Sequence, residues 1–291
     1  MKSNELRIML MGGLGNQLFQ VAAGMYMEQK LGKSIKFSTG ALFKIGNNHQ
    51  NDVSTLLDAF DCQGKEENIS KTRFIISKRL FEVTDKARLS AFLPFYFSKE
   101  AGFDPNLADL QSPKTVFGYF QTWRYFRELQ DKSFFRNLIP QSSRSLEIIK
   151  EILDNDGIAV HVRRGDYLDH RHSNGLLSSL YYADALEAIS ASNNSPVYVF
   201  SDDLPTARTV LGRIINRQNM KFVDGLGSLE GLAVISHSSR IIVANSTYSY
   251  WAGMLSSDGS QIVAPSKWYK GLADPKDLIP KNWRIVQSKW E

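Results

Sequence analysis

Short apolar runs alternate with amphipathic stretches from about residue 158 to the end of the chain. This alternation is typical of a parallel sheet covered by helices. In two of the amphipathic stretches apolar side chains recur at i, i+3, i+4 and i+7, which predicts helices packed on that sheet. The expected strands are residues 158–162, 197–200, 221–223, 240–244 and 261–264, and the expected helices centre on residues 182–189 and 248–255.

The first half of the chain opens with the same pattern. An apolar run at residues 7–11 predicts a strand, the loop GGLGN follows at 12–16, and an apolar helix face after it ends near Gly32. The segment IPQSSRS at 139–145 interrupts the pattern before the second series. We therefore expect an α/β protein with an N-terminal α/β domain at 1–145 and a Rossmann-like domain at 146–291.

Composition narrows the class of protein. The chain has 291 residues, 43% of them hydrophobic, and a single cysteine, Cys62, which has no partner for an internal disulfide. No run of about 18 apolar residues occurs, and the first residues contain no apolar segment of the signal-peptide kind. We expect a cytoplasmic enzyme, and the net charge of +5 suits an anionic ligand such as a nucleotide.

Polar or glycine-rich motifs directly follow four of the expected strands. They are residues 12–17, 161–166, 201–203 and 245–247. Ligands of open parallel sheets bind outside the carboxyl ends of the strands. The four motifs together therefore predict a ligand site, although helix caps also favour such residues.

The motif HVRRGDY at 161–167 places two arginines at one strand end. The planar guanidinium suits phosphate oxygens, and the alternative is a structural ion pair with Asp166 or with the Asp202–Asp203 pair. Neighbouring residues of a strand point to opposite faces. We expect one of Arg163 and Arg164 to face the ligand and the other to brace the wall of the site.

Two further motifs offer neutral hydrogen-bond donors at expected helix starts. Asn245, Ser246 and Thr247 precede a well-patterned helix, where they either bind an anion or only cap the helix. The GGLGN loop resembles half of a dinucleotide fingerprint, but Leu18 stands where the third glycine would be. Gly13, Gly15 and Asn16 still allow a ligand to approach the backbone closely.

Other chemistries find little support in the sequence. The Asp154-Asn155-Asp156 triplet has a metal-binding spacing, but it precedes a strand and so lies at the wrong edge of the sheet. The His170 and His172 pair lacks further zinc ligands nearby, and no G-x-S-x-G motif occurs. We therefore expect no metal and no cofactor.

Five motifs in the same order resemble those of the bacterial α-1,2-fucosyltransferases of glycosyltransferase family 11. They are GGLGNQLFQ, GYFQTWRYF, HVRRGDY, FSDD and IIVANSTYSYW. The resemblance implies a GT-B-like architecture, with two Rossmann-like α/β domains facing a central cleft. It also implies inverting transfer of L-fucose from GDP-β-L-fucose, without metal, to the 2-hydroxyl of a terminal galactose in a surface glycan or oligosaccharide.

The resemblance also implies roles for single residues. Arg163 would contact the β-phosphate, and His161 with Asp203 would hold the guanine; Asp202 is a further expected donor-binding residue. Ser246 and Thr247 would bind the pyrophosphate, and Asn16 would stand near the reacting end of the donor. The identity of the general base stays open among Asp166 and three other residues. For Asp166, a structural hydrogen bond to Arg164 is an equally weighted alternative role. The other base candidates are Asp169, His170 and Glu230.

Three alternatives stay open beside this interpretation, and the first concerns a basic segment of the chain. Seven basic residues lie among aromatic residues between 71 and 99, which indicates either a solvated helix beside an ordinary core or a peripheral contact with a membrane or lipid-linked glycan. A transferase for another nucleotide sugar is a second alternative. A non-catalytic nucleotide- or nucleic-acid-binding protein is a third, although the expected partners include no nucleic acid.

Overall fold

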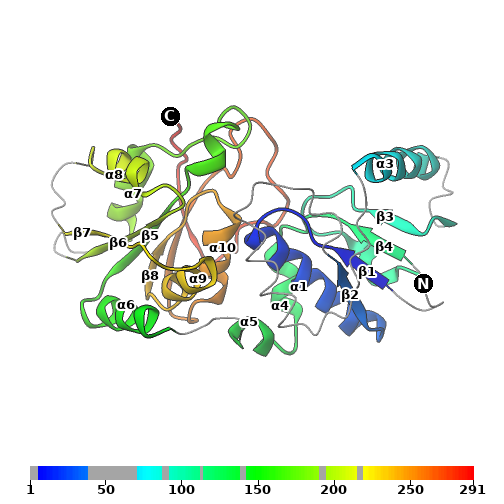
Figure 1. Cartoon of the computed structure of the whole chain (residues 1–291), viewed down its shortest axis with the longest axis horizontal. Helices are drawn as coiled ribbons and strands as arrows, with labels where there is room; N and C mark the ends of the chain where they lie inside the picture. Colours follow the sequence, from blue (N-terminus) through cyan, green and yellow to red (C-terminus); the bar gives the residue numbers. More distant parts are fainter. Residues whose placement is uncertain are drawn as a thin grey trace. The chain divides into compact units, whose positions relative to one another are not determined.

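The structure is a computed structural model that describes residues 6–38, 71–86, 92–111, 114–137, 142–189, 195–214 and 219–291. It divides into two compact units (Figure 1). Unit 1 comprises residues 1–132 with 275–278, and unit 2 comprises residues 133–274 with 279–291. The junction expected near residue 145 falls inside a helix of unit 2, and the chain passes between the units earlier. Cys62 lies outside the described residues.

Unit 1 contains a parallel sheet with the strand order β2-β1-β4-β3. Its strands are β1 (Leu6–Met9), β2 (Ile35–Ser38), β3 (Phe95–Phe97) and β4 (Lys114–Phe117). Its helices are α1 (Leu14–Leu31), α3 (Lys71–Lys86), the short 3-10 helix η2 (Pro105–Asp109) and α4 (Trp123–Glu128). Helix α1 ends as expected, because Gly32 adopts a left-handed conformation with a φ of 61° and its N–H bonds to the Glu28 carbonyl.

Helix α3 begins the basic and aromatic segment at residues 71–99 and shows where its aromatic side chains lie. Phe74 and Phe81 face inward and pack with Phe97 of β3, so these aromatic side chains build an ordinary core. The outward side of α3 instead exposes aliphatic side chains, among them Ile76 and Val83, which the basic and aromatic pattern does not predict. Contact of this surface with a membrane stays a prediction. None of the helices in the described part of the chain is long and apolar enough to cross a bilayer.

Unit 2 contains a six-stranded parallel sheet with the order β10-β9-β8-β5-β6-β7. Read from β7, this is the order 3-2-1-4-5-6 of a doubly wound Rossmann sheet. The strands are β5 (Ile158–Val162), β6 (Val197–Ser201), β7 (Met220–Phe222), β8 (Arg240–Ile242), β9 (Gln261–Pro265) and β10 (Arg284–Val286). The first five confirm the expected strands, and β10 is an addition.

The helices of unit 2 cover both faces of its sheet (Figure 1). Helices α7 and α8 pack on one face, where the main core of the unit lies, and α9 and α10 pack on the other beside α6. The central strand β5 is buried along its whole length, as a strand covered on both faces requires. The helices are α5 (Ser133–Asn137), α6 (Ser143–Asp154), the 3-10 helix η3 (Gly165–Leu168), α7 (Ser179–Ala188), α8 (Leu204–Leu211), α9 (Ser228–Ser236) and α10 (Thr247–Leu255). Two α/β units with parallel sheets confirm the fold class.

Candidate functional site

The strand order of unit 2 reverses direction between β5 and β8. From β5 the chain adds β6 and β7 on one side, then returns to place β8 on the other. Ligands of doubly wound sheets bind outside the strand ends at such a switch point. The loop after β5 carries Arg163 and Tyr167, and the loop after β8 carries Asn245. The two loops meet there, since the Tyr167 hydroxyl donates to the Asn245 carbonyl at 3.0 Å.

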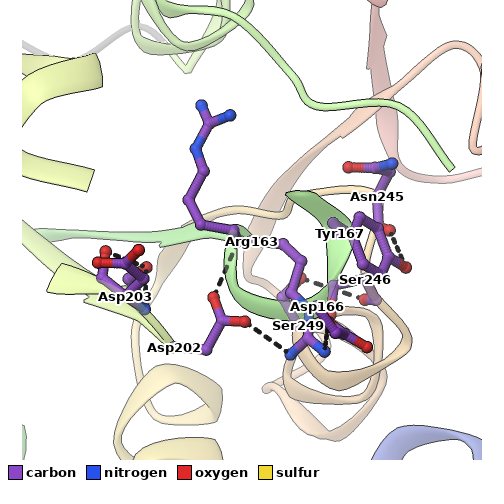
Figure 2. Close-up of polar contacts among 10 residues, drawn as sticks. Arg163, Asp166, Tyr167, Asp202, Asp203, Asn245, Ser246 and Ser249 are labelled. Atoms are coloured by element: carbon purple, nitrogen blue, oxygen red, sulfur yellow. Dashed lines mark hydrogen bonds and ion pairs between the residues drawn. The ribbon is translucent and has the colours of Figure 1, made fainter. Parts of the chain in front are cut away.

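Arg163 lies at this switch point between two carboxylates (Figure 2). Its Nη2 donates to Asp166 at 2.5 Å, and its Nη1 lies 3.3 Å from Asp202. The guanidinium also lies over the Tyr167 ring at 5.1 Å. The Asp166 side chain is 56% exposed, and ion pairs that exposed contribute little to stability. A phosphate can therefore exchange with Asp166 at little cost while Asp202 keeps Arg163 oriented.

Arg164 is fully buried and points elsewhere. Its Nη2 donates to the Leu177 carbonyl at 2.6 Å and pairs with Glu291 at 3.1 Å. Arg164 therefore braces the wall, as expected for one of the two arginines, while Arg163 lies at the strand end, and its contact with a ligand stays a prediction. The alternative that Asp166 bonds to Arg164 is wrong, because Asp166 pairs with Arg163 and the carboxylate on Arg164 is that of Glu291.

The two aspartates after β6 have different contacts. Asp202 accepts the Arg164 backbone N–H at 2.9 Å, so it links both arginines of the motif. Asp203 is the N-cap of α8 and accepts both the N–H and the hydroxyl of Thr206, which lower the pKa of its carboxyl. Asp203 is therefore ionised and fixed in place, and each of its oxygens keeps a lone pair for a further donor.

His161 is buried near the end of β5, on the face of the sheet that carries α10. Its ring lies 5.3 Å from that of Tyr248, and within the described part of the chain its Nδ1 has no hydrogen-bond partner. Burial, with the nearby charge of Arg163, lowers the pKa of His161 to about 3. The imidazole is therefore neutral over the physiological range and can accept a hydrogen bond as well as donate one.

The buried histidine predicts a measurable loss of stability in acid. Because the folded-state pKa of His161 lies below the unfolded value of 6.5, the unfolded chain binds the extra proton as the pH falls from about 6.5 towards 3. This group should lower the free energy of unfolding by about 2 kcal/mol between pH 7 and pH 5. Urea titrations at the two pH values should show a smaller difference for His161→Phe than for the wild type. The control for the change of residue type is His170→Phe, in an exposed turn.

In the motif after β8, the amide of Asn245 makes contacts that the sequence did not predict. The Asn245 amide donates to the carbonyls of Asn174, Gly175 and Trp268 at 3.0, 3.3 and 3.1 Å, so it joins three backbone segments. Its donors are committed to these contacts, and binding of a ligand by this amide is not favoured. Ser246 is the N-cap of α10 but makes no capping bond with its side chain. The Ser246 hydroxyl and the first N–H groups of α10, beginning with Thr247, remain suited to an anion.

The glycine-rich loop belongs to unit 1. Gly12 has a φ of 74°, Gly13 is the N-cap of α1, and Gly15 is buried in its first turn. The Asn16 side chain accepts a hydrogen bond from Gln121 at 2.8 Å, which ties the first turn of α1 to the loop after β4. Gln121 comes from the GYFQTWRYF motif, so the two N-terminal motifs meet at one sheet edge.

The remaining candidates have structural contacts or lie in turns. Glu230 accepts the Gly227 N–H at the start of α9, and the Ser142 hydroxyl together with this N–H lowers the pKa of Glu230. Asp169 and His170 lie in the exposed turn after η3. Asp156 pairs with Arg240, away from the strand ends. Within the described ranges, no group of three or more potential metal ligands occurs.

Sequence comparison identifies relatives along almost the whole chain. The profile described as Glycosyl transferase family 11 matches residues 96–287. An alpha-1,2-colitosyltransferase of Escherichia coli is 25% identical, over 96% of this chain and 98% of the relative. The O-antigen biosynthesis glycosyltransferase WbnK of Escherichia coli is also 25% identical, over 94% and 98%. A galactoside 2-alpha-L-fucosyltransferase of Caenorhabditis elegans is 24% identical, over 95% of this chain and 74% of the relative.

Proposed function

The chain belongs to glycosyltransferase family 11, and from this premise we propose that it transfers L-fucose from GDP-β-L-fucose to the 2-hydroxyl of a terminal galactose with inversion. The position of Arg163 carries the proposal, because it follows β5 at the switch point of a Rossmann sheet, where the loop after β5 contacts the loop that leads into α10. The relative named galactoside 2-alpha-L-fucosyltransferase supports the sugar and the linkage. WbnK, named for O-antigen biosynthesis, supports an acceptor in a surface glycan.

The chemical step needs stabilisation of the departing diphosphate. As the fucosyl–phosphate bond breaks, positive charge develops on the sugar and an additional negative charge on GDP. Arg163 supplies a fixed cation and bidentate donors for that charge, and the N–H groups at the start of α10 supply aligned dipoles. We therefore propose that no metal ion is required for the reaction.

Two carboxylates near Arg163 have separate roles in this proposal. Asp202 holds the guanidinium in place through its second oxygen, while the exposed Asp166 yields its position to the phosphate. Asp166 is then free to accept the proton of the acceptor hydroxyl as a general base. In the proposal His161 and Asp203 hold the guanine, the neutral imidazole through either nitrogen and Asp203 through its free lone pairs.

A second candidate donor is GDP-colitose, favoured by the colitosyltransferase relative. Colitose is L-fucose without the hydroxyl group at carbon 3. A site that hydrogen-bonds this hydroxyl discriminates strongly against the deoxy sugar, by about four orders of magnitude. The two donors therefore separate cleanly in a competition assay.

Product analysis tests the proposal directly. The chain is incubated with GDP-fucose or GDP-colitose and a panel of β-galactosides, with and without a chelator, and the products are examined by mass spectrometry and NMR. We expect an α-1,2-fucosylated galactoside at the same rate in both conditions. Transfer of colitose alone would replace the donor in this proposal, and inactivation by the chelator that added cations reverse would contradict the metal-free mechanism. Absence of transfer from either donor to every galactoside would contradict the function.

A further inference from the structure

The buried arginine of the HVRRGDY motif has one carboxylate partner in the structure. Arg164 is 0% exposed, and its guanidinium contacts the Leu177 carbonyl and the Glu291 carboxylate. Its Nε and Nη1 atoms have no hydrogen-bond partner among the residues that the structure describes. A buried guanidinium without a counter-charge is costly. The carboxylate of Glu291 therefore matters more to Arg164 than a surface ion pair would.

Glu291 is itself held in place by backbone contacts. Its N–H donates to the Leu176 carbonyl at 2.9 Å, and its carbonyl accepts from the Lys270 ammonium at 2.9 Å. The preceding residue, Trp290, forms an antiparallel bridge with Leu177. Leu177 thus contacts the guanidinium through its carbonyl and the segment 289–291 through this bridge. The Glu291 carboxylate reaches Arg164 from a fixed backbone.

The position of Arg164 is transmitted to Arg163 through Asp202. One oxygen of Asp202 accepts the Arg164 backbone N–H at 2.9 Å, and the other lies 3.3 Å from Arg163. The space beside Asp202 is tight, since a Cβ added to Gly165 would lie 2.3 Å from its carboxylate. A displacement of the Arg164 backbone therefore displaces the carboxylate that orients Arg163.

We propose that Glu291 is a positioning residue of the donor site, which fixes Arg164 and, through the Arg164 backbone and Asp202, orients Arg163 towards the diphosphate. Glu291 touches neither donor nor acceptor in this role. The inference rests on the proposed function, because it assigns Arg163 to the diphosphate of GDP-fucose.

The substitution Glu291→Gln tests this role, because it keeps the shape of the side chain and removes its charge. Small misplacements of a catalytic group lower rates by up to about a hundredfold, so we expect kcat to fall about tenfold or more with the KM for the acceptor unchanged. Titration calorimetry should show weaker binding of GDP. The matched control is Lys289→Gln, which breaks an ion pair of the same segment with Asp184 at 2.6 Å without touching Arg164.

A double-substitution cycle separates positioning from simple stabilisation. If Glu291 acts through Arg164, adding Glu291→Gln to Arg164→Lys should change kcat and GDP affinity less than twofold. An undiminished effect in that background would overturn the proposal, as would a Glu291→Gln protein with wild-type kcat and GDP affinity. GDP affinity is measured for the wild type, both single variants and the double variant. The coupling between Glu291 and Arg164 can then be calculated from binding even where turnover is low. Failure of the wild type to bind GDP or transfer fucose would instead contradict the proposed function.

Discussion

Replacing Arg163 with alanine should lower kcat at least a hundredfold. The guanidinium is the cation at the switch point of the sheet in unit 2, and donors fixed towards developing charge contribute about 3 kcal/mol each to the transition state. The substitution also leaves Asp166 and Asp202 without their shared counter-charge beside the diphosphate. Because the effect is on the departing charge, kcat should fall more than the affinity for the intact donor, as steady-state kinetics would show.

Two further variants sharpen this prediction. Arg163→Lys keeps the charge but loses the planar pair of donors, so its turnover should lie between those of the wild type and Arg163→Ala. Arg208→Ala removes the same charge from α8 of the same unit, where the guanidinium lies over the Phe222 ring at 4.1 Å, and it should retain normal turnover. Near-normal turnover of Arg163→Ala would show that the leaving group is stabilised by other residues.

The sequence predicts those parts of the fold that depend on local patterning. The β-branched runs around Val160 and Ile242 become buried parallel strands, and Gly32 ends α1 in the left-handed conformation. The alternation of side chains along a strand also predicts that Arg163 and Arg164 lie in different surroundings. In each case the informative signal, a run of residue types or a single glycine, lies within a few residues of the position that is interpreted, even though the strands themselves pair with distant segments.

The sequence patterns do not predict contacts between residues that are far apart in the chain. Glu291 is far from Arg164 in the chain, and no motif marks it as the partner of a buried arginine. Tyr167 lies inside HVRRGDY, but its bond to the Asn245 carbonyl depends on where the loop after β8 arrives. Short motifs identify which residues lie at strand ends. They do not show which of these side chains are already engaged by the protein itself.

Asn245 is the clearest example of a strand-end side chain that the protein itself already engages. The substitution Asn245→Ala should lower the free energy of unfolding by about 3 kcal/mol. The side chain is 1% exposed, and its loss leaves the carbonyls of Asn174, Gly175 and Trp268 without this donor. The Asn174 carbonyl still accepts the Lys270 N–H at 3.3 Å, so the loss falls mainly on the carbonyls of Gly175 and Trp268, at about 1 to 3 kcal/mol for each buried polar group left unpaired. The midpoint of thermal unfolding should fall by about 10 °C, as measured by circular dichroism.

The control for this substitution is Asn155→Ala, which removes an exposed amide bonded to the Glu151 carbonyl at 2.7 Å and should change the midpoint little. The comparison also distinguishes the two roles considered for Asn245. A residue that binds the donor would lose GDP affinity on substitution and keep its unfolding midpoint, since a ligand contact contributes nothing to the free protein. The three carbonyl contacts predict the opposite result. The unfolding midpoint falls, and GDP affinity declines only to the extent that the loop after β8 loosens.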